Sequence, residues 1–248
     1  PDWHLEPIGT VGPDGKYTSA VPGYEGKFAL DMNVEMIKAL AASGALFAKG
    51  SLRHQYAHCW RCKNPIIYRA TEQWFSSVDG YRKKALEAID QVQWIPSWGH
   101  DRIYNMIRDR GDWCISRQRV WGVPIPIFYC REHNHAVITD ETIAHLQEIF
   151  AKEGSDAWWA HTEKELLPEG FKCPECGCTE FRKESDIMDV WFDSGCTHQG
   201  VLCHDPELAY PADMYLEGSD QHRGWFNSSL LTSVAANRSE ERRVGKEC

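Results

Sequence analysis

The chain has 248 residues, of which 42% are hydrophobic and 25% charged, and its formal net charge is −9. This length and composition suit one or two globular domains, and no apolar run approaches the ~18 residues that a membrane-spanning helix needs. The acidic balance argues against non-specific binding of nucleic acid over the whole surface, whereas a local basic patch would still allow specific binding of RNA.

The first fifty residues are expected to form short strands and turns followed by one helix. Asn33 suits the N-cap of this helix, and Gly44 suits its end. Val34, Ile37 and Leu40 recur at helical spacing, so they predict its apolar stripe.

The next part of the chain is expected to hold a strand and two helices. The strand is predicted at residues 64–70. The first helix would end at Ile89, and the second would span about residues 100–110 and be ended by the following glycine. Ile103 and Ile107 lie four residues apart and would face inward.

Residues 123–129 are predicted to form another strand. Pro124 and Pro126 interrupt it, and proline cannot donate a hydrogen bond to a neighbouring strand, so an edge position is favoured. A clear amphipathic helix then follows, with its apolar positions between Ile143 and Phe150 and its end at Gly154.

The ten cysteines include two pairs with the spacing of a zinc knuckle. Cys59 and Cys62 form the first pair, and Cys173 and Cys176 form the second. The chain starts without an initiator methionine and without the basic and apolar segments of a secretory signal, which indicates a fragment of a cytoplasmic protein. Zinc in a reducing compartment therefore explains the pairs better than disulfides do.

A structural zinc ion needs four ligands, so the second pair requires two more. Cys130 and His133 supply them from one turn, although His135 is an alternative to His133 and Cys178 an alternative to the last cysteine. The predicted zinc ligands are Cys130, His133, Cys173 and Cys176. The first pair, Cys59 and Cys62, has no evident partner pair and is interpreted as a possible second, incomplete site.

The most informative stretch is DMYLEGSDQHRGWF at residues 213–226. Its apolar residues 214–216 predict a buried strand, and Phe226 begins a helical repeat. In an open α/β sheet, ligands bind where a strand ends and the next helix begins. The turn between them combines carboxylates, an amide, a glycine and an imidazole, which suit an amino group and ribose hydroxyls. The alternative is a simple helix start capped by Ser219 or Asp220.

This stretch resembles part of the catalytic domain of isoleucyl-tRNA synthetases, as do DVWFDSG at residues 189–195 and DWCISRQRVWGVP at residues 112–124. The motifs occur in the order that this family has, and the resemblance covers about residues 1–237. It implies an α/β fold, with part of a class I synthetase Rossmann-like catalytic domain, a zinc-knuckle insertion and the tail of an editing domain.

The resemblance also implies the domain organisation. The expected segments are 1–50 as the C-terminal end of the editing insertion, 51–129 as the return into the catalytic domain, 130–185 as the zinc-binding insertion, 186–237 as the second half of the Rossmann-like domain and 238–248 as a non-native tail. A genuine polar surface segment is the alternative for the tail. No editing residue is assigned, because the parts of the editing pocket that characterise the family are absent from these residues.

The function implied by the resemblance is ATP-dependent activation of L-isoleucine and its transfer to tRNA(Ile), with Mg²⁺ accompanying ATP and with editing of misacylated valine in the parent enzyme. The fragment alone is expected to be inactive, and no side chain is expected to act as a nucleophile. The residues expected to contact the adenylate or isoleucine are Glu217, Gly218, Asp220, Gln221, Trp191 and Trp225. The two tryptophans would be walls of the isoleucine pocket, with plain core packing as the alternative.

Two other functions fit parts of the sequence. A zinc-ribbon module that binds RNA or protein without catalysis would account for the cysteine pairs, but it leaves the motifs at 189–195 and 213–226 unexplained. A synthetase for another branched-chain amino acid would share much of the same architecture.

Overall fold

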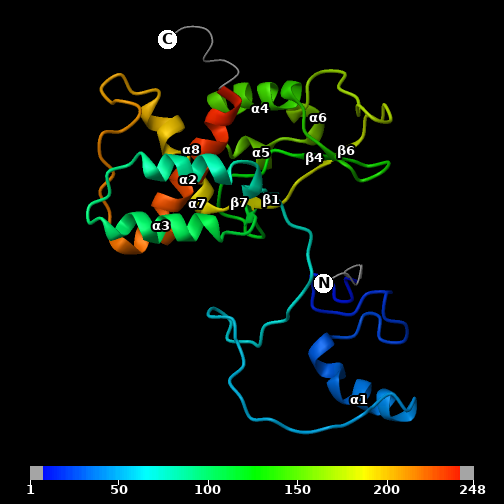
Figure 1. Cartoon of the computed structure of the whole chain (residues 1–248). Helices are drawn as coiled ribbons and strands as arrows, with labels where there is room; N and C mark the ends of the chain where they lie inside the picture. Colours follow the sequence, from blue (N-terminus) through cyan, green and yellow to red (C-terminus); the bar gives the residue numbers. More distant parts are fainter. Residues whose placement is uncertain (1–7, 241–248) are drawn as a thin grey trace. The chain divides into compact units, whose positions relative to one another are not determined.

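The computed structural model describes residues 8–240, with side chains described as far as residue 236 (Figure 1). The chain divides into two compact units, Pro1–Glu72 and Gln73–Cys248. This division lies after residue 72, and the predicted domain boundaries remain predictions. Within the described part of the chain, no helix has the length and apolar character that crossing a membrane would require.

The first unit contains the short 3-10 helix Ala29–Met32 followed by α1 (Asn33–Ala42). The predicted helix is therefore confirmed, although Met32 rather than Asn33 occupies the N-cap position. Gly44 follows the helix with a φ of +73°, a conformation that glycine adopts without strain. The predicted apolar stripe is not buried within this unit, since Val34 is 61% exposed.

The strand predicted at residues 64–70 is wrong. The structure has only an isolated bridge between His58 and Pro65, and beside it the N–H of Ile66 donates to the carbonyl of Ala57 over 3.1 Å. Pro65 has no N–H to donate, so the pairing does not extend into a ladder.

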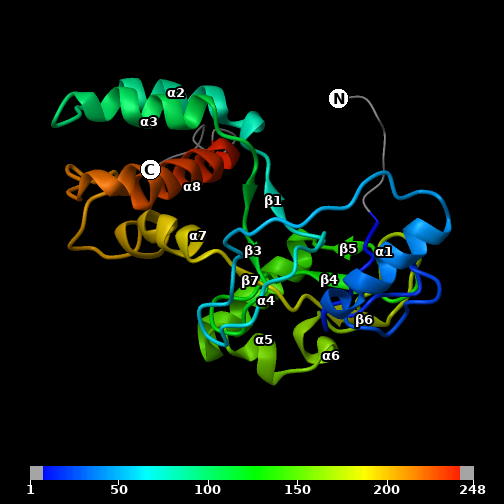
Figure 2. The ribbon, with the colours of Figure 1, turned by 90° about the horizontal axis from the view of Figure 1, so that it is seen from below.

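One half of the second unit is a layer of helices. It consists of α2 (Arg82–Asp90), α3 (Trp98–Arg108), α7 (Val190–Gly195) and α8 (Trp225–Glu240). Figure 2 shows α2 and α3 running side by side against α8, with α7 on the other side of α8. The predicted positions of α2 and α3 are confirmed, because Ile89, Ile103 and Ile107 are completely buried in the core that these helices share.

The other half is built around a small antiparallel sheet in the order β5-β4-β6. Its strands are β4 (Phe128–Cys130), β5 (Ala136–Val137) and β6 (Phe181–Lys183). The helices α4 (Asp140–Glu153), α5 (Ala157–Ala160) and α6 (Glu163–Leu166) pack against it. The predicted amphipathic helix is α4, and Gly154 ends it as expected.

Short strand pairs connect the two halves. β1 (Phe75–Ser76) pairs with β2 (Trp113–Cys114), and β3 (Ser116–Arg117) pairs with β7 (Ile187–Met188), both antiparallel. These pairs place the DWCISRQ motif directly beside the start of the DVWFDSG motif, which lies more than seventy residues later.

Two further strand predictions are wrong. The strand predicted at 123–129 begins only at Phe128 and is central in its sheet, because both prolines lie before the ladder and Pro124 forms only an isolated bridge with Ile187. The apolar run at 214–216 is not a buried strand: Met214 is 76% exposed and Leu216 is 83% exposed. All strand pairs in the described residues are antiparallel, so they contain no parallel Rossmann sheet in which this run could pair.

The crossing of α7 and α8 depends on Gly195. A Cβ atom at this position would lie 2.8 Å from the carbonyl carbon and oxygen of Ser228, closer than packed atoms approach. We expect Gly195→Ala to lower the free energy of unfolding by about 1–3 kcal/mol, because the two helices must separate. Chemical denaturation measures this, with Gly200→Ala as the control, since a Cβ at Gly200 meets no atom within 4 Å. Equal destabilisation by the two variants would contradict the prediction.

Candidate active site and metal centre

A single 3-10 turn, Ser219–Arg223, connects the exposed loop to α8. The side-chain oxygen of Gln221 accepts a hydrogen bond from the backbone N–H of Trp225 over 2.9 Å. Its amide nitrogen donates to Asp220 over 3.2 Å. Gln221 therefore provides the helix cap that was considered for Ser219 or Asp220, and one N–H of its amide is left for a ligand.

The residues before this turn are open to solvent. Glu217, Gly218 and Asp220 are all exposed, and the carboxylate of Glu217 makes no hydrogen bond or ion pair with the described residues. A Cβ atom at Gly218 would lie 2.7 Å from a carboxylate oxygen of Asp220, so glycine leaves space beside that side chain. The loop thus presents two carboxylates that can accept hydrogen bonds from a ligand.

The two predicted pocket tryptophans flank Gly224. A Cβ atom at Gly224 would lie 2.9 Å from the ring of Trp191, which is 42% exposed. The indole N–H of Trp225 donates to the carbonyl of Ser194 over 3.0 Å, and its ring stacks on Tyr215 with centroids 4.6 Å apart. Both rings have an apolar face, but each is also fixed by packing within this unit, as the alternative interpretation expected.

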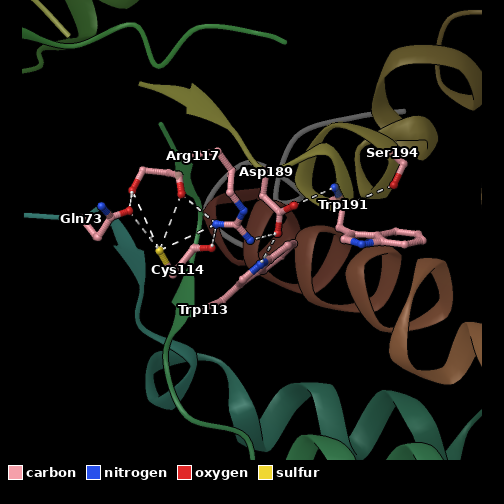
Figure 3. Close-up of polar contacts among 8 residues, drawn as sticks. Gln73, Trp113, Cys114, Arg117, Asp189, Trp191 and Ser194 are labelled. Atoms are coloured by element: carbon pink, nitrogen blue, oxygen red, sulfur yellow. Dashed lines mark hydrogen bonds and ion pairs between the residues drawn. The ribbon is translucent and has the colours of Figure 1, made fainter. Parts of the chain in front are cut away.

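Asp189, two residues before Trp191, carries a buried carboxylate that was not among the predicted site residues (Figure 3). Asp189 forms an ion pair with Arg117 over 2.8 Å and accepts a hydrogen bond from the indole N–H of Trp113 over 3.1 Å. Its other oxygen accepts from the backbone N–H of Trp191 over 3.2 Å and so caps α7. An aspartate just before a helix is a visible capping signal, but the two partners come from a distant segment.

A cavity of about 390 Å³ opens beside this ion pair. It is lined by both ends of the DWCISRQ region, by the start of α7 and by the first turn of α8. Arg117, Asp189, Trp191 and Gly224 are among its lining residues. Of the predicted site residues, Trp191 therefore reaches the cavity, while Glu217, Gly218, Asp220, Gln221 and Trp225 do not line it.

The predicted zinc ligands come together at one point in the other half of the unit. One possible ligand atom from each residue lies within 4.8 Å of the others in the group Cys130, His133, Cys173 and Cys176. The sulfurs of Cys130 and Cys176 are 3.6 Å apart, and the sulfur of Cys173 is 3.7 Å from Nε2 of His133. Tetrahedral zinc, with bonds of about 2.3 Å to sulfur and about 2.0 Å to nitrogen, requires separations of roughly 3.5–3.8 Å. The donor set and its spacing therefore fit zinc.

The two alternative ligands lie outside this group. Nδ1 of His135 is 2.7 Å from the carboxylate of Glu175, which also lies 3.7 Å from His133. The sulfur of Cys178 instead contacts the backbone of Glu180, accepting from its N–H over 3.3 Å. The geometry therefore favours His133 over His135 and Cys176 over Cys178.

The first cysteine pair lies in the other unit. Cys59 is half-buried and Cys62 is exposed, and both are free thiols. In the part of the chain that the structure describes, no group of three or more possible ligands includes them.

Asp193 on α7 provides a pH test of the packing around Asp189. Burial, and then the charge of Asp189, raise the pKa of Asp193 to about 6 from the usual 3.8. The folded protein thus holds this proton more tightly than the unfolded chain, so the associated stability is present at low pH and is lost as the pH rises from about 4 to about 6. We expect Asp193→Asn to melt at a higher temperature than the wild type at about pH 8. Melting curves near pH 3.5 should show no such gain, and a gain independent of pH would contradict the assignment.

Comparison with known proteins gives one consistent answer. The family model described as "tRNA synthetases class I (I, L, M and V)" matches residues 16–241. An isoleucine–tRNA ligase of Moorella thermoacetica is 61% identical over 233 residues, which are 94% of this chain and 25% of the relative. An isoleucine–tRNA ligase of Desulfitobacterium hafniense is 65% identical over 226 residues, 91% of this chain and 24% of the relative. The chain spans about a quarter of the length of these curated relatives. Its motifs, its mixed helices and strands and this match show that the chain belongs to the class I tRNA synthetases of the I, L, M and V group.

Proposed function

We propose that this chain is part of an isoleucine–tRNA ligase, which joins L-isoleucine to tRNA(Ile) at the expense of ATP. The observation that carries the proposal is the identity of 61–65% over nearly the whole chain with relatives of that name. Family membership also disfavours a zinc-ribbon module without catalysis, since such a module would not need the motifs on α7 and α8.

The reaction has two steps. The carboxylate of isoleucine attacks the α-phosphorus of ATP, forming isoleucyl-adenylate and releasing pyrophosphate, and a ribose hydroxyl of the tRNA then takes the acyl group and releases AMP. Neither step needs a protein nucleophile, so the enzyme acts by orienting the substrates and stabilising charge. ATP would be bound together with Mg²⁺.

The loop before α8 is proposed to hold the adenylate. Glu217 and Asp220 have exposed carboxylates that can accept hydrogen bonds from an amino group or ribose hydroxyls, and Gly218 allows close approach. Gln221 would contribute the one amide N–H that its hydrogen bond to Asp220 leaves free. These four residues lie close together in the chain, at the end of the loop and the start of the turn, which supports their acting on one ligand.

The side chain of isoleucine is proposed to lie against Trp191 and Trp225. Flat apolar walls select by shape, and one methylene changes binding by only about 1–3 kcal/mol, so discrimination against valine would need editing. Residues 1–50 are proposed to be the end of the editing insertion of the parent enzyme, where misacylated valine would be hydrolysed. Isoleucine, ATP and tRNA(Ile) are the partners that this function requires.

Zinc is proposed to be held by Cys130, His133, Cys173 and Cys176. The thiolates and the imidazole would join the turn after β4 to the knuckle at 173–176, and bound zinc supplies structural crosslinking rather than chemistry. Cys59 and Cys62 would contribute half of a second site.

The role of Glu217 can be tested in the intact parent enzyme. We expect Glu217→Ala to reduce isoleucine-dependent exchange of pyrophosphate into ATP by about 10²-fold, because a hydrogen bond that orients the amino group or the ribose of the substrate is lost. The melting temperature should not change, since the side chain is exposed. Glu207→Ala, an exposed glutamate in the same irregular segment, is the matched control. Running the assay with isoleucine, valine and leucine also tests the substrate, and exchange with valine or leucine alone would refute the proposed specificity.

The metal centre is tested by metal analysis of the purified protein. We expect Cys173→Ser to lose about one equivalent of zinc and to melt at a lower temperature, because metal binding contributes directly to folding stability. Cys178→Ser should keep its zinc, since the sulfur of Cys178 faces Glu180 instead of the cluster. Loss of zinc from the Cys178 variant, with retention in the Cys173 variant, would show that Cys178 and not Cys173 is the ligand.

A further inference from the structure

His222, in the turn before α8, is 5% exposed and lies among three aromatic rings. The ring centroids of Trp94, Trp98 and Phe226 are 6.0, 5.8 and 5.4 Å from that of the imidazole. The two tryptophans come from the segment before α3 and from its first residue, and Phe226 comes from α8. We call these three rings and His222 the aromatic box.

The two nitrogens of the imidazole differ. Nδ1 lies 2.8 Å from the carbonyl oxygen of Ser219, which can only accept a hydrogen bond, so Nδ1 carries the proton. Nε2 is buried and has no hydrogen-bond partner among the residues that the structure describes. It faces Gly99, where a Cβ atom would lie 3.2 Å from Nε2 and 3.3 Å from Trp94. The imidazole thus makes its hydrogen bond to the turn through Nδ1, and the rest of the ring is held by packing.

The box itself is fixed to the helical layer. The indole N–H of Trp94 donates to the carbonyl of Ile89 at the end of α2 over 3.0 Å, and Ile89 is completely buried. A continuous series of contacts therefore runs from the core of α2 through Trp94 and His222 to the carbonyl of Ser219. Ser219 lies directly before Asp220, which is exposed, and Gln221, which is half-buried.

We propose that His222 is a positioning residue for the adenylate-binding loop. Its Nδ1–H holds the carbonyl of Ser219, and this fixes the turn that presents Asp220 and Gln221 to the ligand. The inference rests on the proposed function, since it assumes that this loop contacts the substrate. Within the described residues, the turn is otherwise closed by backbone bonds from Gln221 to Gly218 and from Gly224 to Gln221, both 3.0 Å, and by the cap from Gln221.

A side chain that only fills space would behave differently from one that positions the loop. Phenylalanine at 222 keeps a ring in the aromatic box but cannot donate to Ser219. Asparagine loses ring atoms, which leaves a small void, but its amide nitrogen can take the place of Nδ1 and donate to the same carbonyl. The hydrogen bond and the packing can therefore be removed separately.

The test measures isoleucine-dependent pyrophosphate exchange and thermal melting of the intact parent enzyme. We expect His222→Phe to lower kcat/KM by up to about 10²-fold, mainly through kcat, while its melting temperature stays near that of the wild type. His222→Asn should melt at a lower temperature yet keep most of the activity. Gly99→Ala adds a methyl group on α3 that presses on Nε2. It should lower kcat/KM as His222→Phe does, but by a smaller factor. His100→Phe, at a half-buried histidine of the same helix that lies outside the aromatic box, is the control and should leave the activity unchanged.

If activity falls in step with the melting temperature, so that His222→Asn is less active than His222→Phe, then His222 is merely structural and the inference is overturned. Full activity of His222→Phe would also overturn it. These outcomes are distinct from failure of the proposed function, in which the wild-type enzyme itself would show no isoleucine-dependent exchange and the inference would fall with it.

Discussion

The packing around the candidate active site depends on the buried carboxylate of Asp189. It joins Arg117 and Trp113 of the DWCISRQ region to the first turn of α7, and its side chain is only 6% exposed. Removing one partner would leave a buried charge without compensation, which costs several kcal/mol in typical cases. The ion pair holds the start of α7, which carries Trp191. At its other end α7 packs against α8 at Gly195 with no space for a methyl group, so the ion pair also influences the position of α8.

The half of the unit that contains the small sheet is stabilised differently. Its strands have only two or three residues each, and its core consists of side chains from β4, β6 and the short helices around them. Cys130 and Cys173 are buried members of that core and also members of the proposed zinc site. A metal ion there would crosslink two turns that the small sheet holds weakly by itself, so packing and ligation would support each other.

Several features of the molecule could be predicted because they depend on neighbours in the chain. The helical spacing of apolar residues around Ile103 and Leu146 predicted α3 and α4, and Gly154 predicted where α4 ends. The strand predictions failed where the outcome depended on a partner: residues 64–70 and 214–216 have suitable apolar residues but no adjacent strand among the described residues. Apolar content alone does not supply the hydrogen bonds that an extended segment needs.

The family resemblance, the helical segments and the four residues able to ligate zinc could be read from the sequence, since motif order, helical period and C-x-x-C spacing are local properties. The orientation of His133 rather than His135 toward the cysteines, the capping of α8 by Gln221 and the pairing of Asp189 with Arg117 follow from the packing of distant segments. Asp189 and Arg117 are 72 positions apart, and His222 meets Trp94 across an even longer gap in the chain. Such contacts depend on how whole helices pack, so no pattern within either segment reveals them.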